Sequence, residues 1–510
     1  MRSTVLWRKR FFSVGLILLL MLLIAGCSGE DAPFIYPISI TSANNTIFTE
    51  DTASTFTVTA TGLPTITFAI TGTLPDGVTF DSASGILSGT PAVGTSGTYT
   101  LTLTAHNGIV SDATQSFTLT VVKIALSNFQ NASVVIGQPD FVSMAINQGG
   151  AAGANTLYHP YGNPLFHNGI LYIPDYLNAR VLGFNGVPTA NNASANFVLG
   201  QPDFTTTIGN SGANQMYGPE TVKVYNGKVF NSDYRNNRVL IWNSAPTTTA
   251  QPANVVVGQT GFGLSSGSCS QTSLNGPESI EVAGGKLIVA DSDNNRVLIW
   301  NTIPTTNGAP ADVVLGQGDF THNAANDNNQ DGIADTAPTA RTLAYPTGVW
   351  SDGTRLIVAD SVNNRILIWN TFPTSNFAPA DVVLGQGDFI HNAYNDDNQD
   401  GIAEAAPTSR TLNYPYFLDS NGTQLFVVDF NNNRVLIWNS IPTANFTPAN
   451  GVLGQGDFTH NMYNDDNQDG VADAAPTART LNYPAGIYVF GKTLIVTDTF
   501  NSRYLIFKQP

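Results

Sequence analysis

The sequence is poor in cysteine and in charge. Of its 510 residues only two are cysteines, only 11% are charged, and 21 Lys and Arg stand against 37 Asp and Glu, for a net charge of −16. Two cysteines exclude a disulfide framework, so packing must hold the fold. The scarcity of basic residues excludes the positive surface that grips nucleic-acid phosphates, and we expect no nucleic-acid partner.

The residues that are abundant favour an all-β protein. Gly, Thr, Asn and Pro are frequent, and these residues supply strands and turns more than helices. Hydrophobic residues make up 42% of the chain, which is enough to build buried cores. We therefore expect a folded, turn-rich chain rather than a disordered one.

Residues 1–26 have the features of an export signal. Four basic residues precede an apolar run over 11–25, and Ile24-Ala25-Gly26-Cys27 follows. The last four residues resemble the cleavage motif of bacterial lipoproteins, and that resemblance implies a lipid on Cys27 after residues 1–26 are removed. Ser28 then implies an outer-membrane or cell-surface location in the bacterial envelope. The alternative is an uncleaved membrane anchor, for which the apolar run is short.

Processing at Cys27 would change the charge and the redox chemistry of the chain. Loss of residues 1–26 leaves 17 basic against 37 acidic residues, a net charge of −20. With Cys27 lipidated, Cys269 has no intrachain partner. We expect a monomer that meets the membrane only through its lipid anchor, over a short tether at 27–36.

The segment 37–122 alternates polar and apolar residues in short runs. The runs include 56–61, 98–105 and 116–122, separated by turn residues, as in a β-sandwich. The stretches L-P-D-G-V-T-F-D at 74–81 and G-I-L-S-G-T-P at 85–91 resemble the Ig- and cadherin-like modules of bacterial surface proteins. That resemblance implies a spacer role.

From residue 124 to 510 the chain repeats one unit six times. Each copy has a Gly-Gln after an apolar run, then a proline that we call the marked proline, then an arginine. The marked prolines and the arginines are Pro160, Pro219, Pro277, Pro346, Pro415 and Pro484, and Arg180, Arg238, Arg296, Arg365, Arg434 and Arg503. From proline to arginine is 19 residues in five copies and 20 in the first, and only the Gly-to-Pro connection varies strongly, from 19 to 30 residues. A unit of constant length with one variable loop predicts a structural repeat.

One copy contains four apolar runs that predict four antiparallel strands. In the fourth copy they lie at 348–350, 355–359, 365–369 and 381–384. Six four-stranded units predict a six-bladed β-propeller, in which the run 133–136 supplies the strand that the last copy lacks. The residues D-x-x-N-N-R after L-I-V-A resemble the NHL repeat. The predicted fold class is thus all-β, an NHL-like propeller preceded by an Ig-like sandwich.

Each copy also carries an Asp five residues before the arginine and an Asn two before it, which with the arginine we call the frame motif. Because the motif occurs in every copy, we interpret it as a turn lock rather than a ring of binding groups. A phenylalanine four residues after each Gly-Gln glycine is interpreted as core.

The long connections of three copies carry acidic loops of one pattern, D-x-N-x-D-G-x-x-[D/E]. Their predicted calcium ligands are Asp327, Asn329, Asp331, Asp335, Asp396, Asn398, Asp400, Glu404, Asp465, Asn467, Asp469 and Asp473. Oxygen ligands at alternate positions with a glycine for the turn can surround Ca²⁺, and the loops resemble those of EF-hands, dockerins and thrombospondin type 3 repeats. Prolines occupy the twelfth position in place of the bidentate Glu. The alternative is an acidic loop without metal.

Four residues that directly follow marked prolines are candidates for a ligand face. Glu220, Glu278, Tyr161 and Tyr416 begin the innermost strands, where they could meet a ligand near the axis or simply be solvated at the rim. His322, His391 and His460 occupy equivalent loops of successive copies, so a propeller would hold them apart.

These features favour a lipid-anchored binding or scaffold protein whose propeller face, stiffened by Ca²⁺, engages a protein or glycan. The alternative is a metal-dependent propeller enzyme, a lyase or a lactonase-type hydrolase, with its site at the central axis. Recognisable nucleophile, phosphate or paired-carboxylate motifs are lacking, so we expect binding rather than catalysis.

Overall fold

The computed structural model describes residues 36–50, 52–92 and 94–509. The signal segment 1–26, Cys27 and the tether as far as residue 35 lie outside the described residues. Among the described residues, no helix combines the length and the apolar character needed to cross a bilayer.

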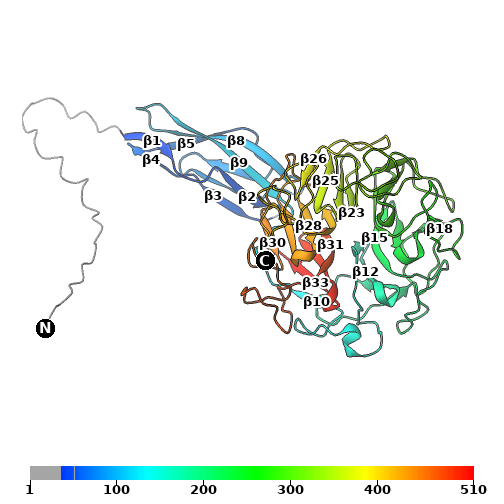
Figure 1. Ribbon diagram of the computed structural model, residues 1–510. Coiled ribbons are helices and arrows are strands. Elements are labelled where there is room, and N and C mark those ends of the chain that lie inside the picture. The colour runs from blue at the N-terminus through cyan, green and yellow to red at the C-terminus, as the bar shows by residue number, and fades with distance from the viewer. Residues whose placement is uncertain (1–35, 51, 93, 510) are drawn as a thin grey trace, which may run out of the picture.

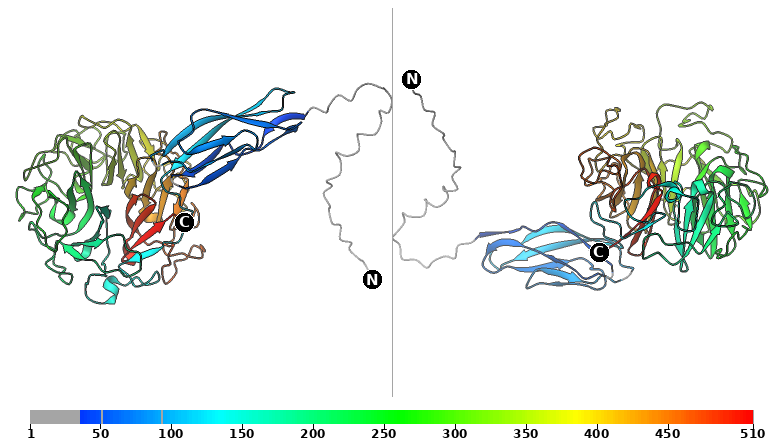
Figure 2. Two further views of the ribbon diagram at one scale, coloured as in Figure 1. Left: turned by 180° about the vertical axis from the view of Figure 1, so that it is seen from behind. Right: turned by 90° about the horizontal axis from the view of Figure 1, so that it is seen from below.

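Residues 36–122 form an Ig-like sandwich that projects from the larger part of the molecule (Figures 1 and 2). Its strands are β1 (Tyr36–Ile40), β2 (Asn45–Thr49), β3 (Ser54–Thr57), β4 (Ala60–Leu63), β5 (Thr67–Thr71), β6 (Val78–Asp81), β7 (Ile86–Gly89), β8 (Gly97–His106) and β9 (Ala113–Val122). One sheet has the order β2-β9-β8-β5, a second has β3-β7-β6, and β1 pairs with β4. Alternate residues of β8 and β9, among them Leu101, Leu103, Phe117 and Leu119, fill the core.

One strand of the sandwich differs from its prediction. The run 56–61 is not continuous, because β3 ends at Thr57 and β4 begins at Ala60 in a different sheet. Between them the amide of Val58 donates to the carbonyl of Gly85, so the chain leaves one sheet before it joins the next.

Residues 134–508 form six four-stranded antiparallel sheets within the described part of the chain. The strands are β10 (Val134–Ile136), β11 (Leu165–His167), β12 (Ile170–Asp175), β13 (Arg180–Asn185), β14 (Phe197–Leu199), β15 (Pro219–Tyr225), β16 (Lys228–Asp233), β17 (Arg238–Trp242), β18 (Val255–Val257), β19 (Pro277–Ala283), β20 (Lys286–Asp291), β21 (Arg296–Trp300), β22 (Val313–Leu315), β23 (Pro346–Ser351), β24 (Leu356–Asp360), β25 (Arg365–Trp369), β26 (Val382–Leu384), β27 (Pro415–Ser420), β28 (Leu425–Asp429), β29 (Arg434–Trp438), β30 (Gly451–Leu453), β31 (Pro484–Phe490), β32 (Thr493–Asp498) and β33 (Arg503–Lys508). Short 3-10 helices lie at η1 (Ile146–Gly149), η2 (Tyr176–Asn178), η3 (Tyr234–Asn236), η4 (Ser292–Asn294), η5 (Phe430–Asn432) and η6 (Thr499–Asn501).

The sheets stand side by side around an axis in a β-propeller-like fold (Figure 1). Their first strands contact one another in sequence, from β15 to β19, β23, β27 and β31. The middle strands are buried on both faces, since apolar side chains of each sheet pack against those of the next. This explains why their sequences are continuously apolar rather than alternating.

The two ends of the repeat region meet in one sheet. β10 pairs with β33 in the register Val134 to Ile506 and Ile136 to Tyr504, which gives the sheet order β10-β33-β32-β31. This last sheet also packs against the first. The hydroxyl of Tyr504 donates to the carbonyl of Pro174 at 2.8 Å, and the side chain of Tyr504 shares one buried cluster with Leu171 and Ile173.

The β10–β33 pairing gives a stability prediction. A chain that begins at residue 138 loses β10, whose three buried side chains each contribute about 1.5–3 kcal/mol, and exposes the edge of β33. We expect thermal unfolding at a much lower temperature, or no cooperative unfolding, when circular dichroism follows this chain.

A chain that begins at residue 124 is the control, because it loses the sandwich but keeps β10. It should unfold cooperatively near the temperature of the ring in the longer chain. Equal melting of the two truncated chains would show that β10 does not hold the ring.

Candidate functional site

The frame motif is buried and joined by hydrogen bonds in every copy. In the fourth copy Asp360 Oδ2 accepts from Arg365 Nε and from Asn363 Nδ2, each at 2.8 Å. Arg365 also donates to the carbonyls of Thr339, Thr342 and Phe389, in the connections before and after the sheet. All six arginines are fully buried and ion-paired with their Asp. The arginine therefore ties three segments together, and the interpretation as a turn lock agrees with this geometry.

The same motif fixes the backbone at the marked prolines. The second oxygen of each Asp accepts the amide two residues before the proline, as Asp360 Oδ1 does from Ala344 at 2.7 Å. In the four copies that have an Asn directly before the arginine, this Asn reaches into the next sheet, where Asn295 Oδ1 accepts the amide of Tyr345 at 2.7 Å. Equivalent bonds join Asn237 to Gly276, Asn364 to Tyr414 and Asn433 to Tyr483. In these four cases two consecutive amides at the entry to the innermost strand are held, one by the Asp of the same sheet and one by the Asn of the preceding sheet.

Residues that precede the marked prolines have a left-handed backbone. Glycine occupies this position in the second and third copies, at Gly218 and Gly276. His159, Tyr345, Tyr414 and Tyr483 occupy it in the others, with φ between 37° and 56°. A bulky side chain in this conformation costs about 1–2 kcal/mol relative to glycine, and such strain gathers at functional sites. The tyrosines are therefore placed there at a cost in stability.

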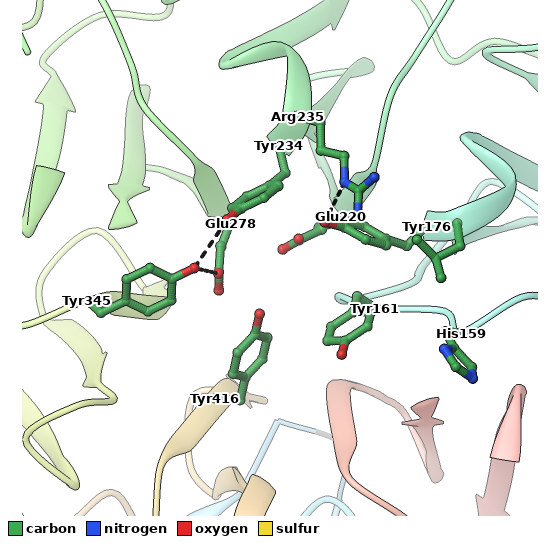
Figure 3. A pocket seen from close by; sticks show the side chains of 10 residues that line it. His159, Tyr161, Tyr176, Glu220, Tyr234, Arg235, Glu278, Tyr345 and Tyr416 are labelled. Carbon is green, nitrogen blue, oxygen red and sulfur yellow. Dashed lines mark hydrogen bonds between the residues drawn. The ribbon is translucent and has the colours of Figure 1, made fainter. Parts of the chain in front are cut away.

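A cavity of about 280 Å³ opens where these segments converge. We call it the axis cavity, and it is lined by His159, Tyr161, Tyr176, Leu177, Glu220, Tyr234, Arg235, Glu278, Tyr345 and Tyr416. Figure 3 shows the carboxyl groups of Glu220 and Glu278 and the hydroxyls of Tyr345 and Tyr416 directed into one space, with the ring of Tyr161 beside it. The lining comes from five of the six sheets or their connections, so the ring as a whole builds the cavity.

Glu220 and Glu278 are the acidic groups of the cavity. They are only 2% and 1% exposed. Tyr345 donates to Glu278 Oε1 at 2.7 Å, and the hydroxyls of Tyr234 and Tyr345 lie 3.3 Å apart. The Oε2 atom of each glutamate is buried and has no hydrogen-bond partner. Solvation at the rim, which the sequence left open for these two residues, is therefore excluded by their burial.

Burial sets the protonation of the cavity. It raises the pKa of Glu278 to about 8, against which hydrogen bonds from Tyr345 and Tyr416 act, and it raises the pKa of Glu220 well above its usual value, with Glu278 adding to the rise. Burial likewise raises the pKa of Tyr161 and Tyr234 to about 12. Glu278 is therefore largely protonated at neutral pH, burial favours the protonated form of Glu220 as well, and the tyrosines keep their hydroxyl protons.

Arg235 lies beside the acidic pair but is engaged with tyrosines. Its Nε donates to the hydroxyl of Tyr176 at 3.1 Å and its Nη1 to that of Tyr217 at 2.9 Å. The guanidinium also lies 5.1 Å and 4.9 Å from the centres of those two rings. Arg235 thus lowers the pKa of Glu220 through space, but it forms its hydrogen bonds elsewhere.

A second polar layer fills the axis further along the innermost strands. Lys223 Nζ lies 2.9 Å from Glu281 Oε2 and 3.7 Å from Asp419 Oδ1, and all three side chains are buried. Lys223, Glu281 and Asp419 each lie four residues after the marked proline of their sheet. Glu220 and Glu278 lie one residue after it. A register shift between the two positions brings both sets toward the axis. The ion pairs make this layer a packed floor rather than a binding surface.

All four residues predicted for a ligand face, Glu220, Glu278, Tyr161 and Tyr416, line the axis cavity. Sequence reasoning missed His159, Tyr176, Tyr234, Arg235 and Tyr345. Each of these occupies the position before the marked proline, or one of the two positions after the frame Asp, where the six copies differ. Variation among otherwise constant copies was the signal that could have found them.

The acidic loops satisfy their own backbone amides. Asp327 is buried, and its carboxylate accepts from the amides of Asp331 at 3.0 Å and Gly332 at 2.8 Å. Asp396 and Asp465 bond equivalently in their loops. The outer carboxylates cap a second amide, as Asp335 does for Asn328 and Asp473 does for Asp466. Calcium binding at these loops stays a prediction, and the hydrogen bonds provide a structural role for the same residues.

Other repeated residues lie apart from the cavity. His322, His391 and His460 each bond the Asp three residues earlier in their own turns. Over the described part of the chain, no group of three or more His, Cys, Asp or Glu side chains is arranged to hold a metal ion. The phenylalanines after the Gly-Gln pairs are partly buried against the cores, and their carbonyls accept from the frame arginines.

Comparison with known proteins identifies the smaller part of the chain. Residues 36–122 match the model of the family described as "Putative Ig domain". No curated protein matches the sequence.

The solved structures that align with the chain do so at low identity and with TM-scores below 0.5. A Bacteroides thetaiotaomicron VPI-5482 protein described as "Putative phosphatase" matches with 12% identity and a TM-score of 0.41, over 93% of this chain and 98% of that one. The PQQ-bound aldose sugar dehydrogenase of Streptomyces coelicolor matches with 12% identity and a TM-score of 0.38, over 70% and 96%. A Bacteroides fragilis NCTC 9343 protein described as "putative alpha-galactosidase" matches with 21% identity and a TM-score of 0.16, and the chain spans 21% of its length.

Proposed function

We propose that the chain is a lipid-anchored protein of the bacterial envelope whose six-bladed, NHL-type propeller binds a ligand in the axis cavity. The observation that carries the proposal is the contrast between the frame and the cavity. The frame motif is the same in every copy, whereas the residues that it positions around the axis differ from copy to copy. Two buried glutamates without an ion-pair partner and five tyrosines are not needed to hold a ring together, so their presence at the axis supports a binding role.

The number and closure of the blades rest on the strand pairing. Six sheets of four strands follow the six copies of the repeat, and the first strand after the sandwich completes the last sheet. The arrangement D-x-x-N-N-R at the turn after the second strand of four sheets, with Ala179 and Ser502 in place of the second Asn in the other two, supports the NHL-type assignment.

The strained backbone supports a binding role. Tyr345 lies in the left-handed conformation that glycine adopts at the same position in two other copies. The stability lost there is explained if the tyrosine ring is needed at the cavity, where its hydroxyl reaches Glu278. A protein or glycan ligand would then insert one small group into the axis cavity, and the remainder of the ligand would contact the propeller face around the cavity.

The cavity gives a direct test of this function. Thermal-shift measurements against a panel of small amines, monosaccharides, amino acids and carboxylic acids should raise the melting temperature of the wild type for at least one class, because a bound ligand stabilises the folded state. The Tyr161→Trp variant, with a larger side chain in the cavity, should lose this response.

Tyr463→Trp is the matched control, since Tyr463 is exposed in an acidic loop away from the cavity. It should respond as the wild type does. If no class shifts the wild type, or if Tyr161→Trp responds equally, the cavity is not the binding site.

We propose further that the acidic loops bind Ca²⁺ weakly and stiffen the face around the cavity. Calorimetric titration of chelator-treated protein should show binding in the millimolar range or tighter. The triple variant Asp331→Ala, Asp400→Ala, Asp469→Ala should lose it, because these three exposed carboxylates occupy the same position of the three loops. Absence of heat up to millimolar calcium in the wild type would leave the loops with their structural role alone.

Attachment through Cys27 is tested in cells. Palmitate label should enter the wild-type protein and not the Cys27→Ala variant, and globomycin should block processing of the wild type. Wild-type protein that takes up no label would contradict the lipid anchor.

A further inference from the structure

We infer that the axis cavity takes a protonated primary amine, either a small free amine or the aminoalkyl end of a larger molecule. The inference rests on the proposed function, since it names the chemistry of the ligand that the cavity would bind. Three features carry it: buried acceptors without partners, a local excess of acidic groups, and walls of aromatic rings.

The unpartnered oxygens define what the ligand must donate. Glu220 Oε2 and Glu278 Oε2 are fully enclosed and accept no hydrogen bond from the protein. A buried carboxyl oxygen without a hydrogen bond destabilises the protein. A ligand that donates an N–H or O–H to this oxygen removes the penalty, and binding is favoured to that extent. Two acceptors directed into one space suit a group with several donors on one atom, and an ammonium has three.

The charge around the cavity favours a cationic donor. Asp293 adds a third acidic group near Glu220, and burial raises its pKa. Arg235 is the one cationic side chain among the lining residues, and its guanidinium is held by Tyr176 and Tyr217. An ammonium bound between the glutamates would therefore pair with the Glu278 carboxylate once that group has lost its proton, and no cationic side chain among the lining residues competes for it by direct contact.

The aromatic walls fit the rest of such a ligand. Tyr161, Tyr176, Tyr234, Tyr345 and Tyr416 surround the acidic pair, and ring faces attract cations while they cover alkyl carbon. A quaternary ammonium would meet the same rings but has no N–H for the two oxygens. A sugar would supply O–H donors but no charge. The primary amine is the class that uses all three features.

Protonation of the glutamates links binding to pH. The titratable and charged groups that face Glu278 are Glu220, Asp293, Arg235, His159, Tyr161, Tyr176, Tyr234, Tyr345, Tyr414 and Tyr416. The pKa of Glu278 is raised to about 8, so below pH 8 its proton must leave before a cation can bind. Affinity for an ammonium should therefore fall about tenfold for each pH unit below 8 and level off above it.

Calorimetry with three matched probes tests the inference. Butylamine carries both charge and N–H donors, tetramethylammonium carries charge alone, and 1-butanol carries a donor without charge. We expect butylamine to bind at least tenfold more tightly than either of the others at pH 8. At pH 7, titrations in two buffers of different ionisation enthalpy should show release of about one proton per butylamine bound.

Two glutamate variants and one control complete the test. Glu278→Gln and Glu220→Gln keep the side-chain shape and remove a buried acid, so both should fold. Each should weaken butylamine binding at least tenfold, and Glu278→Gln should also abolish the proton release. Asp352→Asn, which changes a surface carboxylate of the same ring, should leave both quantities as in the wild type.

The outcomes separate this inference from the function on which it rests. Equal binding of 1-butanol or tetramethylammonium, or butylamine binding without proton release, overturns the amine assignment. A monosaccharide or carboxylic acid that binds in the cavity when butylamine does not also overturns it, but leaves the ligand-binding function standing. Competition between butylamine and the side chain of Nα-acetyl-lysine-N-methylamide, at equal or better affinity, points to a lysine of a protein partner, whereas preference for butylamine points to a free amine.

Discussion

The buried ion pair between an arginine and an aspartate, repeated in each sheet, is the interaction on which the rest of the structure depends. Each arginine uses its guanidinium to hold an Asp and the carbonyls of two connections, so it joins segments that have no strand pairing with one another. Burying two charges is expensive, and the pair is stable because nearly every donor and acceptor is satisfied. Removing either partner of such a pair costs about 3–5 kcal/mol.

The pair also explains how a symmetric ring can carry an asymmetric site. The frame Asp fixes the amide two residues before each marked proline, and in four copies the Asn beside the arginine fixes the next amide, in the following sheet. With the backbone fixed in this way, the side chains at those positions are free to differ. Tyr161, Glu220, Glu278, Thr347, Tyr416 and Ala485 occupy one equivalent position, and the acidic residues among them come from adjacent sheets. The cavity is therefore acidic on one side and aromatic on the other.

The axis cavity and the second polar layer beneath it differ in whether their buried acidic groups have a cationic partner. Lys223, Glu281 and Asp419 form contacts among themselves. Burial lowers the pKa of Lys223, but the two acidic neighbours more than offset this and raise it above its usual value, so Lys223 remains charged. Glu220 and Glu278 have no such partner, and burial raises the pKa of both, which favours their protonated forms. The first arrangement is self-sufficient and stabilises the axis. The second is complete only when another molecule supplies the donors, which is the physical basis of the proposed binding.

The sequence by itself determined the architecture, because strand pairing and turn chemistry act over short distances and leave a periodic pattern. The spacing of the marked prolines and arginines predicted where the strands of each copy would lie, and the apolar run at 133–136 pointed to the partner of β33. It also singled out Glu220, Glu278, Tyr161 and Tyr416 from their position alone. Only the tertiary structure decided that these side chains are buried together, because the distance between residues of different sheets depends on how the whole ring closes. Tyr345 and Arg235 occupy positions that differ among the copies, but only the axis that the sheets share shows that both side chains line the same cavity.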